Sequence, residues 1–168
     1  MRKEILTWQD VSALIEHLIP QFHTEFEALL MISRGGLVPG GILAEALGLT
    51  HILLAAVDFP AQAATSRAKL AAWPQFIQFP EERLLQGRRT LIVDDVWGSG
   101  RTMTAVRARV EAASGIPHTC VLHFNPHRSL FGALRPDYYA AVTDAYIIYP
   151  WEIDTGPDKV LAQPAGVG

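Results

Sequence analysis

The stretch LIVDDVWGSGRTM, residues 91–103, decides the fold and points to the chemistry. Its first residues are apolar and mostly β-branched, which is typical of a strand buried on both faces of a sheet. Two adjacent carboxylates, Asp94 and Asp95, follow this run. A turn of small and hydroxyl-bearing residues (98–102) then leads into a helix that we expect over 102–113. The pattern predicts a buried strand, a turn and a helix, with two acids at the end of the strand.

Short apolar runs of the same kind recur on both sides of this stretch. They predict strands over residues 28–33, 51–57, 89–95, 118–124, 137–143 and 146–149. Helical spacing predicts helices from the capping box of Thr7 and Asp10 to Pro20, over 39–48 and over 102–113. Buried strands that alternate with helices predict an α/β domain with a mainly parallel twisted sheet and flanking helices.

The chain length and one unusual segment bear on domain organisation. A chain of 168 residues is long enough for one compact domain and short for two, so residues 1–168 are expected to form one. Residues 58–80 are rich in alanine and proline and carry Arg67 and Lys69. We interpret them as an insertion that is mobile and functional, because loops of this length usually have one of these properties.

The composition excludes several classes of protein. A net charge of -3 gives no reason to expect nucleic acid as a partner. The chain has one cysteine, Cys120, which we expect to be buried, and its six histidines show no metal-ligand spacing. The N-terminus does not resemble a signal peptide, and no apolar run is long enough to cross a membrane. We therefore expect a cytoplasmic protein without a membrane partner.

The acids and the turn after residue 93 must be explained together. Ligands of open α/β sheets bind beyond the carboxyl ends of the strands, and a glycine-rich turn before a helix attracts phosphate. Two familiar phosphate motifs do not match, because Asp95, Arg101 and Met103 replace the residues that they require. Carboxylates accept hydrogen bonds from a ribose diol, so a ribose 5-phosphate fits both features. The alternative is a capped turn with solvated acids.

Residues 91–103 resemble the phosphoribosyl-pyrophosphate (PRPP) motif of type I phosphoribosyltransferases. The resemblance implies that Asp94 and Asp95 bind the ribose hydroxyls of PRPP and contact Mg²⁺ indirectly, through PRPP and water. It also implies a 5-phosphate loop that consists of Gly98, Ser99, Gly100, Arg101 and Thr102. The fold implied is that of the type I family, with a small hood over the sheet.

A second stretch, SRGGLVPGG (residues 33–41), resembles the pyrophosphate loop of the xanthine-guanine members of that family. The resemblance implies that pyrophosphate binds at Ser33, Arg34, Gly35 and Gly36, and that the peptide between Ser33 and Arg34 is cis. Arg34 would supply positive charge, and the glycines would allow close approach of the backbone. The alternative is an ordinary glycine turn between a strand and a helix.

A third stretch, PDYYAAVTDAYIIYPWEI (residues 136–153), resembles the C-terminal region of the same group. The resemblance implies a hood segment over about 136–156, in which Tyr146 stacks on the purine and backbone groups near Ile147 bind the base edge. The alternative for Tyr146 is a strand aromatic packed in the core.

Two positions depart from the pattern of enzymes that act on 6-oxopurines. Those enzymes usually carry an acid where this chain has Gly98, and a lysine where it has Asn125, which can still donate a hydrogen bond to the base. Both changes concern the base and not the sugar phosphate. Two alternatives therefore stand beside a purine transferase: a regulatory protein that binds PRPP without using it, and a transferase for a non-purine acceptor.

The reaction implied moves ribose 5-phosphate from PRPP to a nucleobase such as guanine, xanthine or hypoxanthine, and releases pyrophosphate. Asp94, Asp95 and Arg34 would form the catalytic set, with Mg²⁺ as the ion and a cation from the insertion, Lys69 or Arg67, as a further contact. We expect a homo-oligomer, either a dimer or a tetramer. Trp97 could cover the ligand or pack on the neighbouring helix.

Overall fold

The computed structural model describes residues 2–58 and 73–153. Its strands are β1 (Lys3–Ile5), β2 (Ala28–Ser33), β3 (Ile52–Asp58), β4 (Gln75–Gln78), β5 (Arg89–Trp97), β6 (Ile116–Phe124), β7 (Tyr138–Val142) and β8 (Tyr146–Ile148). Its helices are α1 (Trp8–Leu18), α2 (Leu37–Leu47), α4 (Glu82–Leu85), α5 (Arg101–Ala112) and α6 (Pro150–Ile153), with a 3-10 turn η1 (Ile19–Gln21). In this part of the chain, every helix is too short or too polar to cross a membrane.

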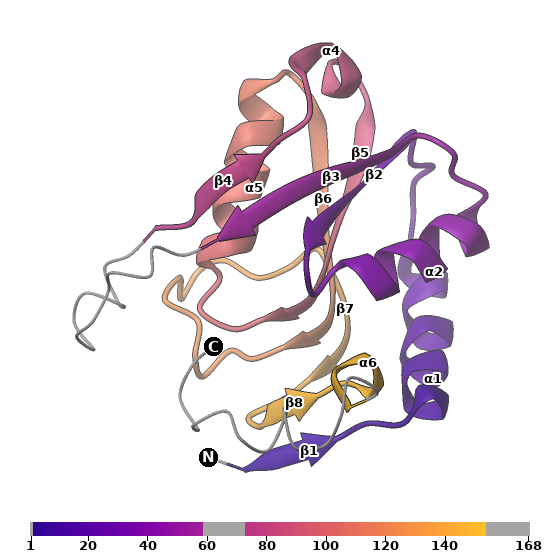
Figure 1. The fold of residues 1–168 in the computed structure, drawn as a ribbon, viewed down its shortest axis with the longest axis vertical. Coiled ribbons are helices and arrows are strands. Elements are labelled where there is room, and N and C mark those ends of the chain that lie inside the picture. The colour runs from indigo at the N-terminus through magenta and orange to yellow at the C-terminus, as the bar shows by residue number, and fades with distance from the viewer. Residues whose placement is uncertain (1, 59–72, 154–168) are drawn as a thin grey trace.

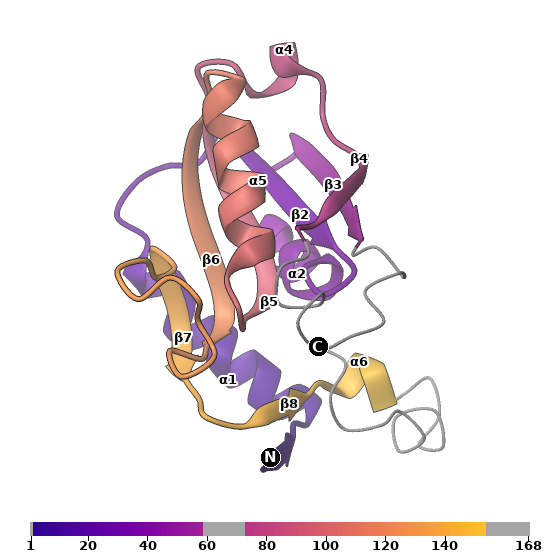
Figure 2. The same ribbon diagram turned by 90° about the vertical axis from the view of Figure 1, so that its left-hand side faces the viewer.

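The main sheet has six strands in the order β4-β3-β2-β5-β6-β7. All neighbouring strands are parallel except β3 and β4. Helix α5 covers one face of the sheet, and α1 and α2 cover the other (Figures 1 and 2). The predicted α/β fold with a mainly parallel sheet is therefore confirmed.

Two apolar clusters fill the space between the sheet and its helices. One joins α1 and α2 to the sheet and contains Cys120, which is fully buried as predicted. The other joins α5 to the opposite face and contains Trp97. The sequence alternates between these clusters along β5, because Leu91 and Val93 belong to the first and Ile92 to the second.

The local signals at helix ends hold in the structure. Thr7 and Asp10 form the predicted capping box at the start of α1, and Gly48 ends α2 with a φ of 64°. The helix predicted over 102–113 is α5, which begins one residue earlier.

The strand order reverses between β2 and β5, the two central strands. From β2 the chain passes through α2 to β3 on one side, and from β5 through α5 to β6 on the other. Such a point in an open parallel sheet leaves a crevice at the carboxyl ends of the two strands, where ligands bind. The loops after β2 and β5 are the two that the sequence singled out.

A small hood lies at the lower end of the molecule in Figure 1, where β1 pairs with β8 in parallel and α6 follows. The predicted hood segment was too long at its start, because residues 138–142 form β7, the edge strand of the main sheet. The predicted insertion was also too long, because residues 75–78 form β4 and extend that sheet. Residues 59–72, with Arg67 and Lys69, lie outside the described residues.

Candidate functional site

The loop after β2 contacts the carboxyl-terminal part of β5 at the switch point. A Cβ atom placed on Gly35 would overlap the carboxylate of Asp95. A Cβ on Gly36 would overlap the main-chain carbonyl oxygen of Val93. Glycine at both positions therefore lets the 33–36 loop pack against the end of β5, which places the predicted pyrophosphate loop beside Asp95, one of the two predicted ribose acids.

Asp94 and Asp95 are partly buried and accept hydrogen bonds from neighbouring backbone groups. Asp94 Oδ1 lies 2.9 Å from the N–H of Asp95, and Asp95 Oδ1 lies 2.7 Å from the N–H of Val96. Burial raises the pKa of Asp94 well above its ordinary value, and the charge of Asp95 raises it further. Burial likewise raises the pKa of Asp95 to about 6, with a smaller contribution from Glu152.

Six other acids of the described residues have a basic side chain as an ion-pair partner. They are Glu4, Glu27, Glu81, Glu111, Asp137 and Asp144. Within that part of the chain, neither Asp94 nor Asp95 has a basic side chain as its ion-pair partner. Two adjacent carboxylates without a cation are unfavourable unless a ligand donates to them.

The 98–102 loop forms the N-terminus of α5. Gly100 has a φ of 84°, and no side chain caps the helix from this position. Ser99 Oγ lies 3.3 Å from the N–H of Arg101 and 3.3 Å from its Nε. Thr102 is the second residue of the helix and is half-buried. An N-terminus of a twelve-residue helix without a side-chain cap offers backbone N–H groups to an anion.

Trp97 lies beneath this loop rather than over it. Its side chain is 4% exposed and contacts Phe124 with ring centroids 6.1 Å apart. A Cβ atom on Gly100 would overlap the indole. The indole Nε1 donates a hydrogen bond to Oγ of Ser129, in the loop after β6, at 3.2 Å. Of the two roles open for Trp97, packing is the one that the structure shows.

The 33–36 loop has the implied backbone geometry, with a cis peptide between Ser33 and Arg34. Arg34 is exposed, and Ser33 and Gly35 are half-buried. The N–H of Gly36 donates to the carbonyl of Ile32 at 2.8 Å, inside the turn. Gly36 therefore contributes packing against β5 and the start of α2, whereas Arg34 faces solvent.

The hood places Tyr146 and Ile147 near the two acids. Tyr146 is half-buried, and burial raises its pKa, followed by the charges of Glu152 and Asp95. The N–H of Tyr146 donates to the carbonyl of Arg2, and the carbonyl of Ile148 accepts from the N–H of Leu6, so both groups point toward the segment that contains β1. Because neighbouring residues of a strand point their backbone groups to opposite sides, the N–H and carbonyl of Ile147 face away from β1.

Comparison with known proteins identifies this arrangement. A family model described as "Phosphoribosyl transferase domain" matches residues 1–155. This chain belongs to the phosphoribosyltransferase family. Xanthine-guanine phosphoribosyltransferase of Gluconobacter oxydans (strain 621H) is 27% identical over 158 residues, which are 90% of this chain and 84% of that protein.

Two further relatives show the breadth of this phosphoribosyltransferase family. Adenine phosphoribosyltransferase of Chlorobium phaeobacteroides is 29% identical over 107 residues, 63% of this chain and 60% of that protein. The crystal structure of a purine phosphoribosyltransferase from Pyrococcus horikoshii is 26% identical and superposes with a TM-score of 0.75 over 90% of this chain and 95% of that chain.

Asn125 occupies an inward position in this phosphoribosyltransferase. It follows β6, is 2% exposed, and its N–H donates to the carbonyl of Trp97 at 3.0 Å. Its side-chain Oδ1 accepts from the N–H groups of His127 and Arg128 at 3.1 and 3.3 Å. These contacts form a turn that shapes the loop after β6. A role toward the base stays a prediction.

The sequence did not single out three residues that join the hood to the PRPP motif of this phosphoribosyltransferase. Tyr149 is 1% exposed and donates its hydroxyl to the carbonyl of Asp95 at 3.1 Å. His123 lies 2.8 Å from the same hydroxyl, and Glu152 accepts from the N–H of Tyr149 at 2.7 Å. Tyr149 and Glu152 lie in the YPWE string beside Tyr146, which is their local signal, whereas no local signal pointed to His123.

Proposed function

We propose that this protein transfers ribose 5-phosphate from PRPP to a ring nitrogen of a purine base and releases pyrophosphate, in the presence of Mg²⁺. The observation that carries the proposal is the contact between Gly35 and Asp95, which joins the pyrophosphate loop to the ribose acids at the switch point. Membership of the phosphoribosyltransferase family supports the class of reaction.

The sugar phosphate end of PRPP would bind first to the loop after β5. Asp94 and Asp95 would accept hydrogen bonds from the ribose hydroxyls. These charge-assisted hydrogen bonds would stabilise the two carboxylates in place of a cation. The 5-phosphate would bind at the start of α5, where Gly98, Ser99, Gly100, Arg101 and Thr102 surround the helix N-terminus. This binding fixes the ribose carbon that reacts.

The pyrophosphate end would lie against the 33–36 loop. Arg34 is exposed at this edge and would offset the charge of the leaving group. Within the described residues, no group of three or more His, Cys, Asp or Glu side chains is arranged to hold a metal ion. This fits Mg²⁺ that is held mainly by the phosphates of PRPP and water, with Asp94 and Asp95 reached indirectly. When bound, it would supply positive charge to the departing pyrophosphate.

The base would lie under the hood. Tyr146 would stack on the ring, and the backbone groups of Ile147 that face away from β1 would bind its edge. Guanine, xanthine and hypoxanthine are the proposed acceptors. The Gluconobacter oxydans relative, which this chain matches over 84% of its length, is named a xanthine-guanine phosphoribosyltransferase. The reacting carbon would pass through an oxocarbenium-like state, as in sugar transfer generally.

A panel of bases tests the proposal. PRPP and Mg²⁺ are mixed with guanine, xanthine, hypoxanthine, adenine and two pyrimidines in turn, and pyrophosphate release is followed. Turnover with a 6-oxopurine above the others is the expected result. Turnover with a pyrimidine alone would overturn the purine assignment, and PRPP binding without any turnover would overturn the enzyme.

A regulatory protein that binds PRPP without using it is the second candidate, and Gly98 is the observation that favours it. Nothing lies within 4 Å of a Cβ atom placed on Gly98, so the first side-chain atom of an aspartate meets no neighbour there. A positioned acid contributes about 10²–10⁴-fold in rate. Gly98→Asp should raise turnover with guanine or hypoxanthine at unchanged PRPP affinity.

The control for this variant is Gly132→Asp, because Gly132 also has open space around its Cβ position. If the parent and Gly98→Asp both bind PRPP and neither turns over any base, the regulatory protein is the correct reading. A rise with Gly98→Asp that Gly132→Asp does not share supports the enzyme.

We further propose a cytoplasmic homo-oligomer, either a dimer or a tetramer. Helix α2 has the sequence LVPGGILAEAL, so it is apolar on most sides. Its residues Leu37 and Ile42 are nevertheless exposed. A helix that is apolar on all sides is usually covered. Light scattering coupled to size exclusion measures the mass, and a monomer at micromolar concentration would contradict the proposal.

A further inference from the structure

Tyr149 is the residue whose hydroxyl connects the hood with the main sheet at the site. Its oxygen lies 3.1 Å from the carbonyl oxygen of Asp95 on β5 and 2.8 Å from Nδ1 of His123 on β6. Tyr149 itself belongs to the hood, three residues after Tyr146 and next to α6. One side chain therefore touches the segment that binds the base and the segment that binds the ribose.

The ring of Tyr149 is held on several sides. It stacks on Trp151 with centroids 4.5 Å apart and an angle of 4° between the planes. Trp151 in turn contacts Trp8 of α1 at 6.0 Å. The N–H of Tyr149 donates to Glu152, and the side chain is 1% exposed. Because the ring cannot swing, its hydroxyl fixes the separation of the hood from the end of β5.

The hydrogen-bond directions follow from the partners. A carbonyl oxygen only accepts, so the one proton of the Tyr149 hydroxyl is donated to Asp95. The hydroxyl then accepts from His123, which requires a proton on Nδ1. Burial raises the pKa of Tyr149 well above its ordinary value and lowers the pKa of His123 to about 4, so a protonated phenol and a neutral imidazole meet at neutral pH.

We propose that Tyr149 and His123 form a positioning pair that sets the distance between the base held by Tyr146 and the ribose held by Asp94 and Asp95. This inference rests on the proposed function, because it assumes that both ligands are present. Transfer needs the ring nitrogen of the base in line with the ribose carbon, and a displacement of about 1 Å can lower the rate about 10²-fold. Neither residue touches a reacting atom.

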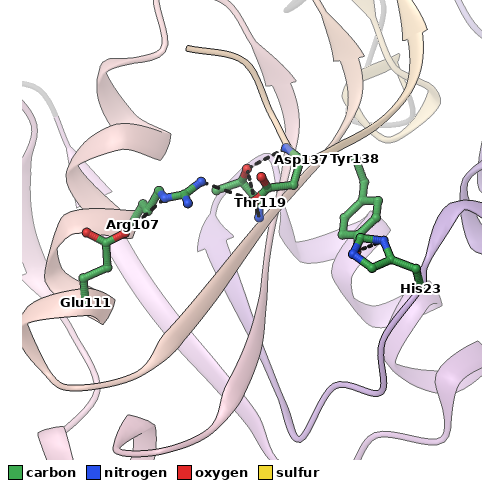
Figure 3. Close-up of polar contacts among 6 residues, drawn as sticks. All are labelled: His23, Arg107, Glu111, Thr119, Asp137 and Tyr138. Carbon is green, nitrogen blue, oxygen red and sulfur yellow. Dashed lines mark hydrogen bonds and ion pairs between the residues drawn. The ribbon is translucent and has the colours of Figure 1, made fainter.

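The test replaces Tyr149 by phenylalanine, which keeps the ring stack and removes the hydroxyl. The matched control is Tyr138→Phe, because Tyr138 is a second buried tyrosine (3% exposed) whose hydroxyl lies 2.9 Å from a histidine, His23 (Figure 3). Tyr138 pairs with Cys120, three residues before His123 along β6, so it belongs to the same sheet without reaching the site. Both variants lose one hydroxyl that lies within hydrogen-bond distance of a histidine.

We expect Tyr149→Phe to lower kcat with the best base about 10- to 100-fold, with the Kd for PRPP within about twofold of the parent. Tyr138→Phe should keep kcat within about twofold. A kcat of Tyr149→Phe that matches the parent, or an equal loss in both variants, would overturn the positioning pair.

His123 is tested by two replacements. His123→Asn keeps an N–H near the position of Nδ1 and should restore most of the rate, whereas His123→Leu should resemble Tyr149→Phe. Nitrogen NMR of the parent should show the His123 proton on Nδ1. Equal kcat for the asparagine and leucine variants, or a proton on Nε2, would contradict the role of His123 in the pair.

A failure of the proposed function is distinguishable from a failure of the pair. If the parent shows no turnover with any base, the proposed function is wrong, and the pair is judged by affinity. Tyr149→Phe must then weaken binding of a purine nucleoside 5′-monophosphate at least about fivefold, and leave ribose 5-phosphate within about twofold, since only the former spans both segments. Equal effects on the two ligands, or none, would overturn the pair.

Discussion

Two clusters around acids lie on this sheet, one around the exposed Asp137 and one around the half-buried Asp94 and Asp95, and they are built in opposite ways. Asp137, at the start of β7, accepts from the N–H and hydroxyl of Thr119 at 2.8 and 3.1 Å and from Arg107 at 3.3 Å (Figure 3). Arg107 also pairs with Glu111 one turn along α5. Oδ2 of Asp137 is thus supplied by three protein groups, among them a cation.

Asp94 and Asp95 lie near the carboxyl end of β5, which β6 separates from β7, and they accept from adjacent backbone N–H groups. Their pKa values are raised because burial disfavours their charge, and the described residues supply no cation to offset it. The two clusters differ in whether the fold itself supplies a cation to the carboxylate. A structural acid has its partners within the fold, whereas a binding acid is left for a ligand to complete.

The largest effect expected from this contrast is on PRPP binding. Asp94→Asn and Asp95→Asn should each weaken it about 10- to 100-fold, because a hydrogen bond to a charged group contributes about 1.5–3 kcal/mol. Asp137→Asn should leave the affinity unchanged. Calorimetry with PRPP and Mg²⁺ measures all three. Parent-like binding by both site variants would end the assignment of these acids to the ribose diol.

A second effect separates the base from the sugar phosphate. Tyr146→Ala should weaken the apparent affinity for the best base by about 1–3 kcal/mol, the usual contribution of stacking, and leave PRPP binding in place. Tyr146→Phe keeps the ring and is the control. Initial rates at varied base concentration provide the measurement. An alanine variant with the affinity of the parent would return Tyr146 to a packing role.

The third effect is on the free energy of unfolding, which replacement of the acid by asparagine should change with opposite signs in the two clusters. The pKa of Asp95 is about 6 in the folded protein against an ordinary value of 3.8, so the folded state binds more protons between these pH values. Its contribution to stability therefore becomes less favourable as pH rises from about 4 to 6, and the penalty is complete above that range. Asp95→Asn should stabilise the ligand-free protein by about 1–3 kcal/mol at pH 8 and by little at pH 4.

Asp137→Asn should destabilise the protein at pH 8, by about 1–2 kcal/mol, because it weakens hydrogen bonds that are already made. Urea unfolding of both variants at pH 8 and of Asp95→Asn at pH 4 checks the signs. If Asp95→Asn also destabilised the protein at pH 8, the hydrogen bond from the Val96 N–H would outweigh the cost of burying the charge, and the contrast with Asp137 would be lost.

The sequence predicted the local structure around Asp94 and Asp95 well, because its signals are local. The run before Asp94 is apolar for a strand buried on both faces, and the glycines after it mark a turn, so neither depends on distant contacts. The capping box of Thr7 and Asp10 is complete within four residues. Local signals of this kind also placed Ser33 to Gly36 at the end of β2.

The rest depends on contacts between distant segments. β1 consists of Lys3–Ile5, which are exposed, and it forms a strand because it pairs with β8 more than 140 residues later. In β4, Phe76 is half-buried and the other three residues are exposed, and the strand forms because it pairs antiparallel with β3. Tyr149 and His123 come from segments 26 residues apart, and nothing in either local pattern shows that their side chains meet.

The smallest effect concerns the exposed end of the Asp137 cluster. Arg107 pairs with Glu111 at 3.2 Å, with side chains 41% and 56% exposed, so water screens the attraction. Exposed pairs four residues apart on a helix contribute about 0.3–0.5 kcal/mol. Glu111→Ala should therefore change the free energy of unfolding by no more than about 0.5 kcal/mol, and the change should shrink at high salt.

The Asp137→Asn variant provides the reference, because it removes charge from the acceptor that Thr119 holds. If Thr119 supplies most of the stabilisation, Asp137→Asn must be the more harmful of the two variants at every salt concentration. A loss with Glu111→Ala as large as that with Asp137→Asn would mean that the exposed ion pairs hold Asp137 in place. The acid of β7 would then depend on its cations, and the absence of a described cation at Asp94 and Asp95 would be the whole difference between the two clusters.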